Sequence, residues 1–191
     1  MPAHAQTSTA AIVAAGRRLM EEHGIDALTM RDVADAVGVR APSLYKRVRN
    51  RSDLLRLILE DVADELTLAL DTAAGSGDPV ADLRAMAAAY RRFAHANPVT
   101  YTLLMFPPHV MPGATARSVR SSATLLRTIA EVAGQAHTLP AARLMVAWAH
   151  GFITMELAGA FRLGGDVEQA WDFGLDRILA AVGRTADGRL S

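Results

Sequence analysis

Apolar residues recur at steps of three and four along most of the chain, which is the spacing of helices that bury one face. No segment is predicted to be a strand. Gly, Ser and Pro interrupt the pattern at 73–79, and three prolines predict a second loop at 106–113. The pattern therefore predicts an all-α protein of about nine helices. They span about residues 8–23, 29–37, 42–48, 50–72, 79–96, 97–104, 116–133, 140–161 and 167–183. Asn50, Asp78 and Asp166 are the expected caps of the helices that follow them.

Residues 29–48 carry the most informative pattern. Thr29, with Asp32 three residues later, predicts a capped start of a short helix. Gly38 follows that helix, where a left-handed conformation can end it and turn the chain. Pro42 suits the first turn of a second helix, because that turn leaves its amides unbonded. Two short helices around a glycine-containing turn form the helix-turn-helix pattern.

The charge of the second short helix differs from that of the whole chain. The chain balances 20 basic against 20 acidic residues, yet residues 40–51 hold five bases (Arg40, Lys46, Arg47, Arg49 and Arg51) and no acid. A small cationic patch on an exposed helix is suited to contacts with phosphates. The alternative interpretation is an ordinary solvated helix face.

The order of residue types in this region resembles the DNA-binding domain of the tetracycline-repressor (TetR) family. The resemblance is carried by Thr29, Arg31, Val33, Ala34, Val37, Gly38, Val39, Pro42, Ser43, Leu44, Tyr45, Val48, Asn50, Arg51, Leu54 and Leu55. It implies a helix-turn-helix DNA-binding domain over 7–53, with the motif itself at about 29–48. An effector-binding and dimerisation domain is then expected over 54–185, and flexible tails at 1–6 and 186–191.

The resemblance also implies which side chains meet DNA. The residues expected at base edges are Arg31, Ala41, Pro42 and Lys46. Those expected at phosphates are Thr29, Ser43, Tyr45, Arg47 and Arg51. The alternative for Tyr45 is a ring packed under the helix. Leu44 and Val48 are expected in the core, because they point inward at i and i+4.

Composition excludes several kinds of chemistry. The chain has no cysteine, which rules out disulfides, thiolate metal sites and cysteine nucleophiles. No metal and no cofactor is predicted. Hydrophobic residues make up 51% but aromatic residues only 5%, which favours a core of closely packed helices. No run of 18 apolar residues and no signal peptide is present, so we expect a soluble cytoplasmic protein without a membrane partner.

The last two predicted helices are candidates for a dimer interface. The segment 140–161 is apolar nearly all round, which is unusual for a surface helix of a monomer. The final helix adds Ala170, Phe173, Leu175, Ile178, Leu179 and Val182. Because one short helix reads few base pairs, we expect a homodimer through these helices on a palindromic operator in double-stranded DNA. The alternative is that both helices are internal core.

A looser resemblance concerns the second half of the chain. Trp148, His150 and Gly151 resemble the Trp-His-Gly (WHG) signature of one TetR subgroup, and 89–105 resembles the helix pair before it. This resemblance implies a cavity for a small apolar effector. Its expected walls are Met86, Tyr90, Phe93, Tyr101, Met105, Phe106, Met111, Trp148, Phe152 and Met155. Such side chains adapt to varied apolar guests, but an ordinary core has the same spacing.

His150 and Glu156 are two polar residues of the otherwise largely apolar helix 140–161. Six positions place them about 240° apart round the helix, so a shared metal or catalytic site is not expected. His150 is interpreted as a core or interface histidine, with effector contact as the alternative. Glu156 is expected to pair with an arginine or another polar group, because an unpaired carboxylate on an apolar face is costly. The alternative is again effector contact.

Three functions are consistent with these patterns. The preferred hypothesis is a homodimeric repressor that a small apolar effector releases from a palindromic operator. The second is a DNA-binding protein without an effector. An enzyme is not expected and no catalytic residue is assigned. The chain has no Gly-x-Ser-x-Gly, no His-Glu-x-x-His and no phosphate loop, and its six histidines are scattered.

Overall fold

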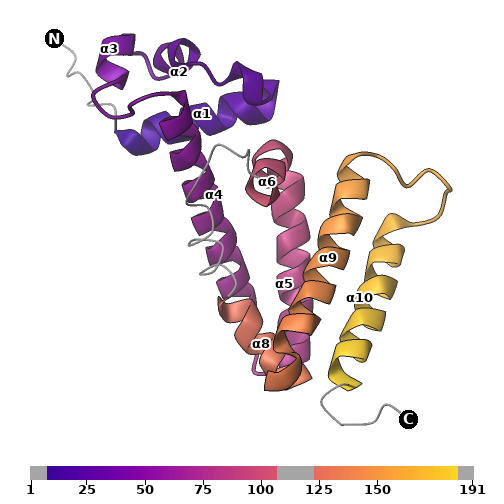
Figure 1. The fold of residues 1–191 in the computed structure, drawn as a ribbon. Helices are drawn as coiled ribbons and strands as arrows, with labels where there is room; N and C mark the ends of the chain where they lie inside the picture. The colour runs from indigo at the N-terminus through magenta and orange to yellow at the C-terminus, as the bar shows by residue number, and fades with distance from the viewer. Residues whose placement is uncertain (1–7, 107–122, 185–191) are drawn as a thin grey trace. The chain divides into compact units, whose positions relative to one another are not determined.

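The computed structural model describes residues 8–106 and 123–184 (Figure 1). Within these residues it contains nine α-helices, two short 3-10 helices and no strand, which confirms the all-α prediction. The α-helices are α1 (Thr9–His23), α2 (Met30–Ala36), α3 (Ala41–Leu44), α4 (Arg51–Ala73), α5 (Pro79–Ala96), α6 (Pro98–Met105), α8 (Ala123–Ala133), α9 (Thr138–Leu157) and α10 (Val167–Arg184). The 3-10 helices are η1 (Ile25–Ala27) and η2 (Gln135–His137).

The described chain divides into two compact units. Unit 1 comprises residues 8–65 and 97–106, and unit 2 comprises residues 66–96 and 123–184. Helix α4 runs from one unit into the other, so the two are joined by continuous helix. None of the described helices is both long and apolar enough to span a membrane.

Helix α1 closes the core of unit 1. The Ser8 hydroxyl accepts a hydrogen bond from the Ala11 amide (3.1 Å), and Gly24 ends the helix at φ 84°. A Cβ at Gly16 would lie 2.9 Å from Cδ1 of Ile58 and 3.1 Å from Cδ1 of Leu28. The absent side chain therefore allows α1 to lie directly on α4.

Polar contacts join α1 to α6 inside unit 1. The Glu21 carboxylate accepts hydrogen bonds from the Val99 amide (3.0 Å) and from the Thr100 amide (2.9 Å) and hydroxyl (2.6 Å). Arg17 donates to Oδ1 of Asn97 (2.6 Å). Because the first amides of a helix lack partners within it, Glu21 satisfies the start of α6 and lets Asn97 and Thr100 be buried.

Unit 2 is built round one apolar core shared by α5, α8, α9 and α10. The buried residues of this core are Leu83, Ile129, Val132, Ala133, Ala141, Ala142, Met145, Leu175, Leu179 and Val182. Asp78 caps α5, because its Oδ1 accepts from the Val80 amide (2.9 Å). Asp166 caps α10 in the same way through the Glu168 amide (2.8 Å). Both caps and the bounds of α5 match the prediction.

The predicted helix 140–161 has different bounds in the structure. Helix α9 begins at Thr138 and ends at Leu157, not at 140 and 161. It ends early because Gly159 adopts φ 62°; the Gly159 amide donates to Glu156 O and the Ala160 amide to Met155 O, a Schellman end. Of the predicted helix 116–133 only 123–133 is described, and of the loop 106–113 only Phe106.

Trp148 on α9 packs directly on the backbone of α10. A Cβ at Gly174 would lie 2.5 Å from Cζ2 and 2.9 Å from Cε2 of Trp148. The indole ring is itself held by Trp171, at 4.8 Å between ring centroids, and by Phe152, at 5.8 Å. The ring therefore has little freedom to move away from a larger residue at position 174.

We expect Gly174→Ala to lower the free energy of unfolding by about 2 kcal/mol, because the new Cβ would overlap the Trp148 ring. This loss should outweigh the gain of about 1 kcal/mol that alanine gives to a helix interior. Gly183→Ala is the control on the same helix, because its Cβ would lie 3.8 Å from Cγ1 of Val132, an ordinary contact. That variant should be at least as stable as the wild type. Urea unfolding of the two variants measures the difference, and equal stabilities would contradict the packing argument.

Candidate nucleic-acid interface

The first helix of the helix-turn-helix has the predicted cap and the predicted end. The Thr29 hydroxyl accepts from the Asp32 amide (3.1 Å) and donates to Oδ2 of Asp32 (2.6 Å). Gly38 has φ 70° and its amide donates to Asp35 O (3.1 Å). The Val39 amide donates to Ala34 O (3.0 Å), which completes a Schellman turn. Glycine tolerates this left-handed turn without strain.

The second helix is shorter than predicted. Helix α3 covers Ala41–Leu44, and residues 45–47 continue as turns. The Val48 amide still donates to Leu44 O at i−4, but the Arg47 amide reaches the same carbonyl at i−3. Mixed i−3 and i−4 bonds are common where a short helix tightens at its end. Leu44 and Val48 are fully buried, as predicted, and hold this segment to the unit.

The predicted DNA contacts lie on the surface round α3. The exposed members are Thr29, Arg31, Pro42, Ser43, Tyr45, Lys46, Arg47 and Arg51, and Ala41 is half-buried. Tyr45 is 51% exposed, which does not support the alternative of a ring packed under the helix. The structure therefore leaves these side chains accessible to a partner.

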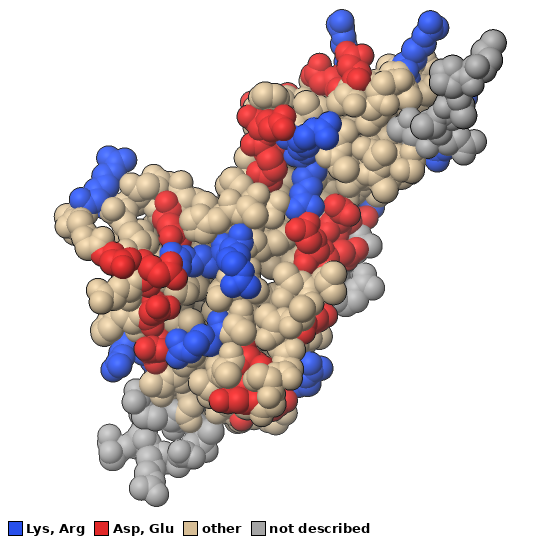
Figure 2. Space-filling model, turned by 180° about the vertical axis from the view of Figure 1, so that it is seen from behind, with Lys and Arg blue, Asp and Glu red and all other residues tan. Residues whose placement is uncertain are grey.

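Four cations in this region have no partner among the described residues. Arg31, Arg40, Lys46 and Arg47 are exposed, and none of their side chains forms a hydrogen bond or ion pair within residues 8–106 or 123–184. Figure 2 shows basic side chains projecting from the molecular surface with acidic side chains between them. An exposed cation without a partner is available to a phosphate or a base edge.

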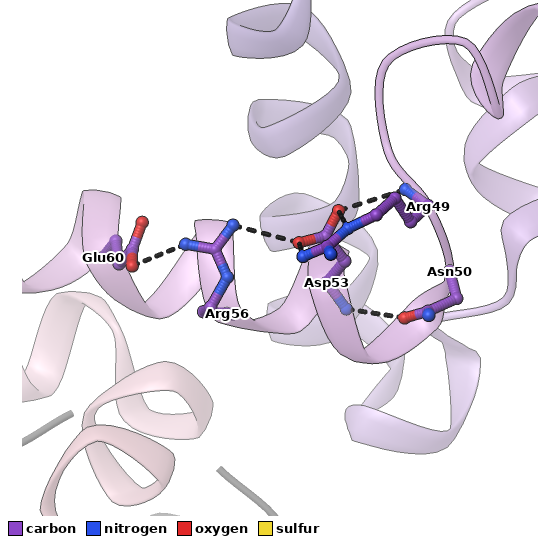
Figure 3. Close-up of polar contacts among 5 residues, drawn as sticks. All are labelled: Arg49, Asn50, Asp53, Arg56 and Glu60. Carbon is purple, nitrogen blue, oxygen red and sulfur yellow. Dashed lines mark hydrogen bonds and ion pairs between the residues drawn. The ribbon is translucent and has the colours of Figure 1, made fainter. Parts of the chain in front are cut away.

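Basic and acidic side chains alternate along the start of α4, from Arg49 through Asp53 and Arg56 to Glu60 (Figure 3). Oδ1 of Asn50 accepts from the Asp53 amide (2.9 Å), which is the predicted cap. The Asp53 carboxylate accepts from the amide (3.1 Å) and Nη2 (3.0 Å) of Arg49 and from Nη2 of Arg56 (3.0 Å). Arg56 also donates to Oε1 of Glu60 (2.6 Å). Arg49 is therefore a helix-capping residue as well as part of the basic segment.

These hydrogen bonds hold the pKa of Asp53 well below its ordinary value of 3.8, with the Arg49 side chain as the largest cause. A carboxyl with a lowered pKa stabilises the fold above its ordinary pKa and loses that contribution as the pH falls towards the folded value. We expect Asp53→Asn to lower the melting temperature by a few degrees at neutral pH, for a loss of about 1 kcal/mol. The deficit should shrink below pH 3.8, and a deficit independent of pH would contradict this account.

Arg51, the exposed first residue of α4, uses its guanidinium for two hydrogen bonds within the protein. Nε donates to the carbonyl of Leu28 (2.7 Å) and Nη2 donates to the carbonyl of Ile25 (2.7 Å). Its predicted phosphate contact stays a prediction. Sequence reasoning missed these two bonds, because a carbonyl acceptor leaves no signal in the sequence.

The residues predicted to line an effector cavity are spread over both units. Met86, Tyr90, Phe93, Trp148, Phe152 and Met155 belong to unit 2, and Tyr101, Met105 and Phe106 to unit 1. Met111 lies outside the described residues. Met86, Phe93 and Tyr101 are buried, whereas Phe106 and Met155 are exposed. An open surface pocket of about 540 Å³ in unit 2 is lined by other residues: Asp71, Ala74, Gly75, Gly77, Asp82, Thr124, Arg127, Thr128 and Glu131.

Part of the predicted wall does form an aromatic cluster in unit 2. Phe152 lies 5.8 Å from Trp148, 5.3 Å from Trp171 and 4.7 Å from Phe161, between ring centroids. Sequence reasoning missed Trp171 and Phe161. Trp171 could have been found from the sequence, because Trp171, Leu175 and Leu179 follow one another at steps of four and so share one face of the last helix.

Glu156 pairs with basic residues, as predicted. Its carboxylate accepts from Nε (3.0 Å) and Nη2 (2.6 Å) of Arg91, and it lies 2.9 Å from Nε2 of His95. Arg91 also lies 5.0 Å from the centre of the Trp171 ring. The Arg91 hydrogen bond is the main cause that lowers the pKa of Glu156. His150 is half-buried, and burial lowers its pKa.

Helices α9 and α10, which lie side by side in Figure 1, expose apolar side chains on the surface of unit 2. On α9 these are Leu139, Leu144, Val146 and Met155, and on α10 Phe173. Of the final-helix residues predicted for an interface, Leu175, Leu179 and Val182 belong instead to the core of their own unit. They are buried because α10 packs on α8 and α9 through that face.

Fold and surface together define an all-α protein with a helix-turn-helix unit and a helical second unit. Two family profiles match the chain. Residues 12–58 match the bacterial regulatory proteins of the tetR family, and residues 83–178, half of the chain, match the tetracyclin repressor-like C-terminal domain. The chain therefore belongs to the TetR family, whose members are transcriptional regulators and not enzymes.

Relatives and solved structures agree with this assignment. The HTH-type transcriptional regulator Rv1816 of Mycobacterium tuberculosis is 34% identical over 125 residues, 63% of this chain and 52% of the relative. The match thus spans about half the length of that relative. A Rhodococcus sp. RHA1 protein of unknown function shares the fold with a TM-score of 0.83 and 24% identity, over 95% of this chain and 98% of that one. TetR-Q116A from Acinetobacter baumannii in complex with minocycline has a TM-score of 0.65 and 22% identity, over 91% and 94%.

Proposed function

We propose that this protein is a homodimeric repressor that reads a palindromic operator in double-stranded DNA, in the cytoplasm where that DNA lies. The observation that carries the proposal is the set of exposed cations round a short helix anchored by Leu44 and Val48. Residues 7–53 form the DNA-binding domain, and 54–185 form the domain that binds effector and partner subunit.

The proposed contacts with DNA come from the start of α2, from α3 and from the turn after α3. Base edges are contacted by Arg31, Ala41, Pro42 and Lys46, and phosphates by Thr29, Ser43, Tyr45 and Arg47. Arg31 is long enough to reach O6 and N7 of a guanine, and Ala41 and Pro42 offer apolar surface to thymine methyl groups. The exposure of these side chains supports the assignment.

A second copy of the chain covers the exposed apolar face of α9 and α10. Leu144 and Phe173 are 49% and 65% exposed, which is costly for side chains of their size in a monomer. Small residues at Ala147 and Gly151 are also exposed on α9, so a partner helix can approach closely. Two-fold pairing would present two α3 helices to successive turns of the duplex, about 34–36 Å apart.

A small apolar effector releases the protein from DNA in this proposal. The related Acinetobacter structure holds minocycline, which supports ligand binding by this fold. Trp148, His150 and Gly151 support the WHG subgroup, and the aromatic cluster round Phe152 supplies apolar surface. Differential affinity of the effector for two conformations is sufficient for release.

DNase footprinting of the purified protein on DNA flanking its own gene tests the proposal. We expect protection of an inverted repeat whose half-sites are about one helical turn apart. Absence of protection on every inverted repeat at low salt would refute it.

A DNA-binding protein without an effector is the second candidate. The burial of Met86, Phe93 and Tyr101 favours it, because those side chains behave as ordinary core. Thermal unfolding with a panel of small hydrophobic compounds separates the two candidates. A rise in melting temperature with any compound, together with lost footprinting, favours the ligand-responsive repressor.

Arg31 and Arg47 are expected to differ in what they contribute. Arg31→Ala should reduce discrimination at one base pair by roughly 1–3 kcal/mol, because it removes a base-edge contact. Arg47→Ala should weaken binding to all sequences and lower the salt slope by about 0.9, because it removes a phosphate contact. Competition titrations with single-base operator variants at several salt concentrations measure both. Equal loss of specific and non-specific affinity in the two variants would refute the assignment.

A further inference from the structure

We propose that Arg51 is a positioning residue of the helix-turn-helix: it fastens the point where the chain enters the motif to the point where the chain leaves it. The proposal deepens the proposed DNA reading and rests on it. It differs from the expectation that Arg51 neutralises a phosphate, and the two assignments predict different measurements.

The geometry places Arg51 at both ends of the motif. Leu28 immediately precedes Thr29, the residue that caps α2, and Arg51 is the first residue of α4. Nε of Arg51 donates to the Leu28 carbonyl and Nη2 to the Ile25 carbonyl, each at 2.7 Å. One guanidinium therefore closes the whole segment between Leu28 and Arg51.

The helices inside this segment need such a restraint. Helix α2 has seven residues and α3 has four, and helices below about 12 residues are marginal on their own. Leu44 and Val48 supply apolar burial, which is not directional. The planar fork of an arginine gives fixed directions that burial cannot supply.

The carbonyl contacts also account for a cation at this position. The first residue of a helix faces the positive end of the helix dipole, where a positive charge is unfavourable. Two carbonyl oxygens offset that cost for Arg51. A charged donor forms stronger hydrogen bonds than a neutral one, so the contact with Leu28 and Ile25 is firm enough to orient the motif.

Lysine separates the two assignments at this position. Arg51→Lys keeps the charge that a phosphate would need, but one ammonium cannot reproduce two donors fixed in a planar fork. A phosphate contact contributes about 0.9 to the salt slope of binding, whereas a positioning residue contributes nothing to it. The binding test therefore uses Arg51→Lys and Arg51→Ala, with Arg47→Ala from the same basic segment as the reference for a lost phosphate contact.

Fluorescence anisotropy measures binding to the footprinted duplex and to a scrambled duplex of equal length, between about 50 and 200 mM salt. We expect Arg51→Lys to lose about tenfold in affinity for the footprinted duplex, the loss expected for one charged hydrogen bond. Its salt slope and its affinity for the scrambled duplex should stay at wild-type values. Arg47→Ala should lower the slope on both duplexes, which is the result that a lost phosphate contact gives.

Amide hydrogen exchange of the free protein tests the same proposal without DNA. Exchange in residues 25–44 should be faster in both Arg51 variants and unchanged in unit 2. Any one of three results overturns the proposal. The exchange of residues 25–44 is as slow in the variants as in the wild type, Arg51→Lys binds like the wild type, or Arg51→Ala has a salt slope about 0.9 lower than the wild type. Faster exchange throughout both units also overturns it, because it assigns Arg51 a general role in stability. If the wild type binds no duplex, the proposed function fails while the exchange measurement still decides the role of Arg51.

Discussion

Replacing Phe173 and Leu144 with glutamate is expected to convert the protein from dimer to monomer and to abolish footprinting. Phe173 is 65% exposed and Leu144 is 49% exposed, so neither substitution opens the core of unit 2. In a two-fold dimer each change acts on both subunits. Loss of about 2 kcal/mol at each copy of a single anchor raises the dimer dissociation constant roughly a thousandfold.

The folded monomer should survive these changes. A glutamate at position 173 can pair with Arg177 one turn later, where Phe173 now lies 5.5 Å from that guanidinium. Leu68→Glu is the matched control, because Leu68 on α4 is 66% exposed but lies outside α9 and α10. Sedimentation equilibrium should show a monomer for Phe173→Glu/Leu144→Glu and a dimer for Leu68→Glu. A dimer in both variants would place the interface elsewhere.

Local signals in the sequence predicted most of the helices. Thr29, Asn50 and Asp78 cap the helices that they were predicted to cap, and Gly38 turns the chain where expected. These features succeed because a cap or a left-handed glycine acts within a few residues of itself. The early end of α9 at Gly159 shows the limit, since the apolar pattern continues past the glycine that stops the helix.

Contacts between distant residues were harder to predict. The need of Glu156 for a basic partner follows from burial alone, but its partner Arg91 is 65 positions away. The two carbonyl acceptors of Arg51 belong to the backbone, which every residue shares. The sequence therefore indicates which groups need partners, and only the fold decides which groups meet.

Arg91→Met is expected to lower the free energy of unfolding by about 3 kcal/mol, because it removes the main partner of a buried carboxylate and leaves only the weaker contact with His95 among those described above. The side chains of Arg91 and Glu156 are only 13% and 15% exposed, and they share two hydrogen bonds. Methionine keeps apolar contact with the Trp171 ring, so the loss reports mainly on Glu156. Such a loss corresponds to a fall in melting temperature of roughly 6–12 °C for a chain of this length.

Two further variants isolate the charge of Glu156 as the cause. Arg91→Met/Glu156→Gln should recover much of the lost stability, because it removes the stranded carboxylate. Arg84→Met is the control, because Arg84 forms an ion pair with Asp176 between α5 and α10. These two side chains are 47% and 48% exposed, so the cost should stay below about 1 kcal/mol. Because the Arg91 contact lowers the pKa of Glu156, the Arg91→Met deficit should be largest above pH 4.5 and shrink as the pH falls below it. Two results would contradict this account: Arg84→Met and Arg91→Met lose equal stability, or the double variant is as unstable as Arg91→Met. Either result would show that burial of the Arg91–Glu156 ion pair is not what holds α5 to α9.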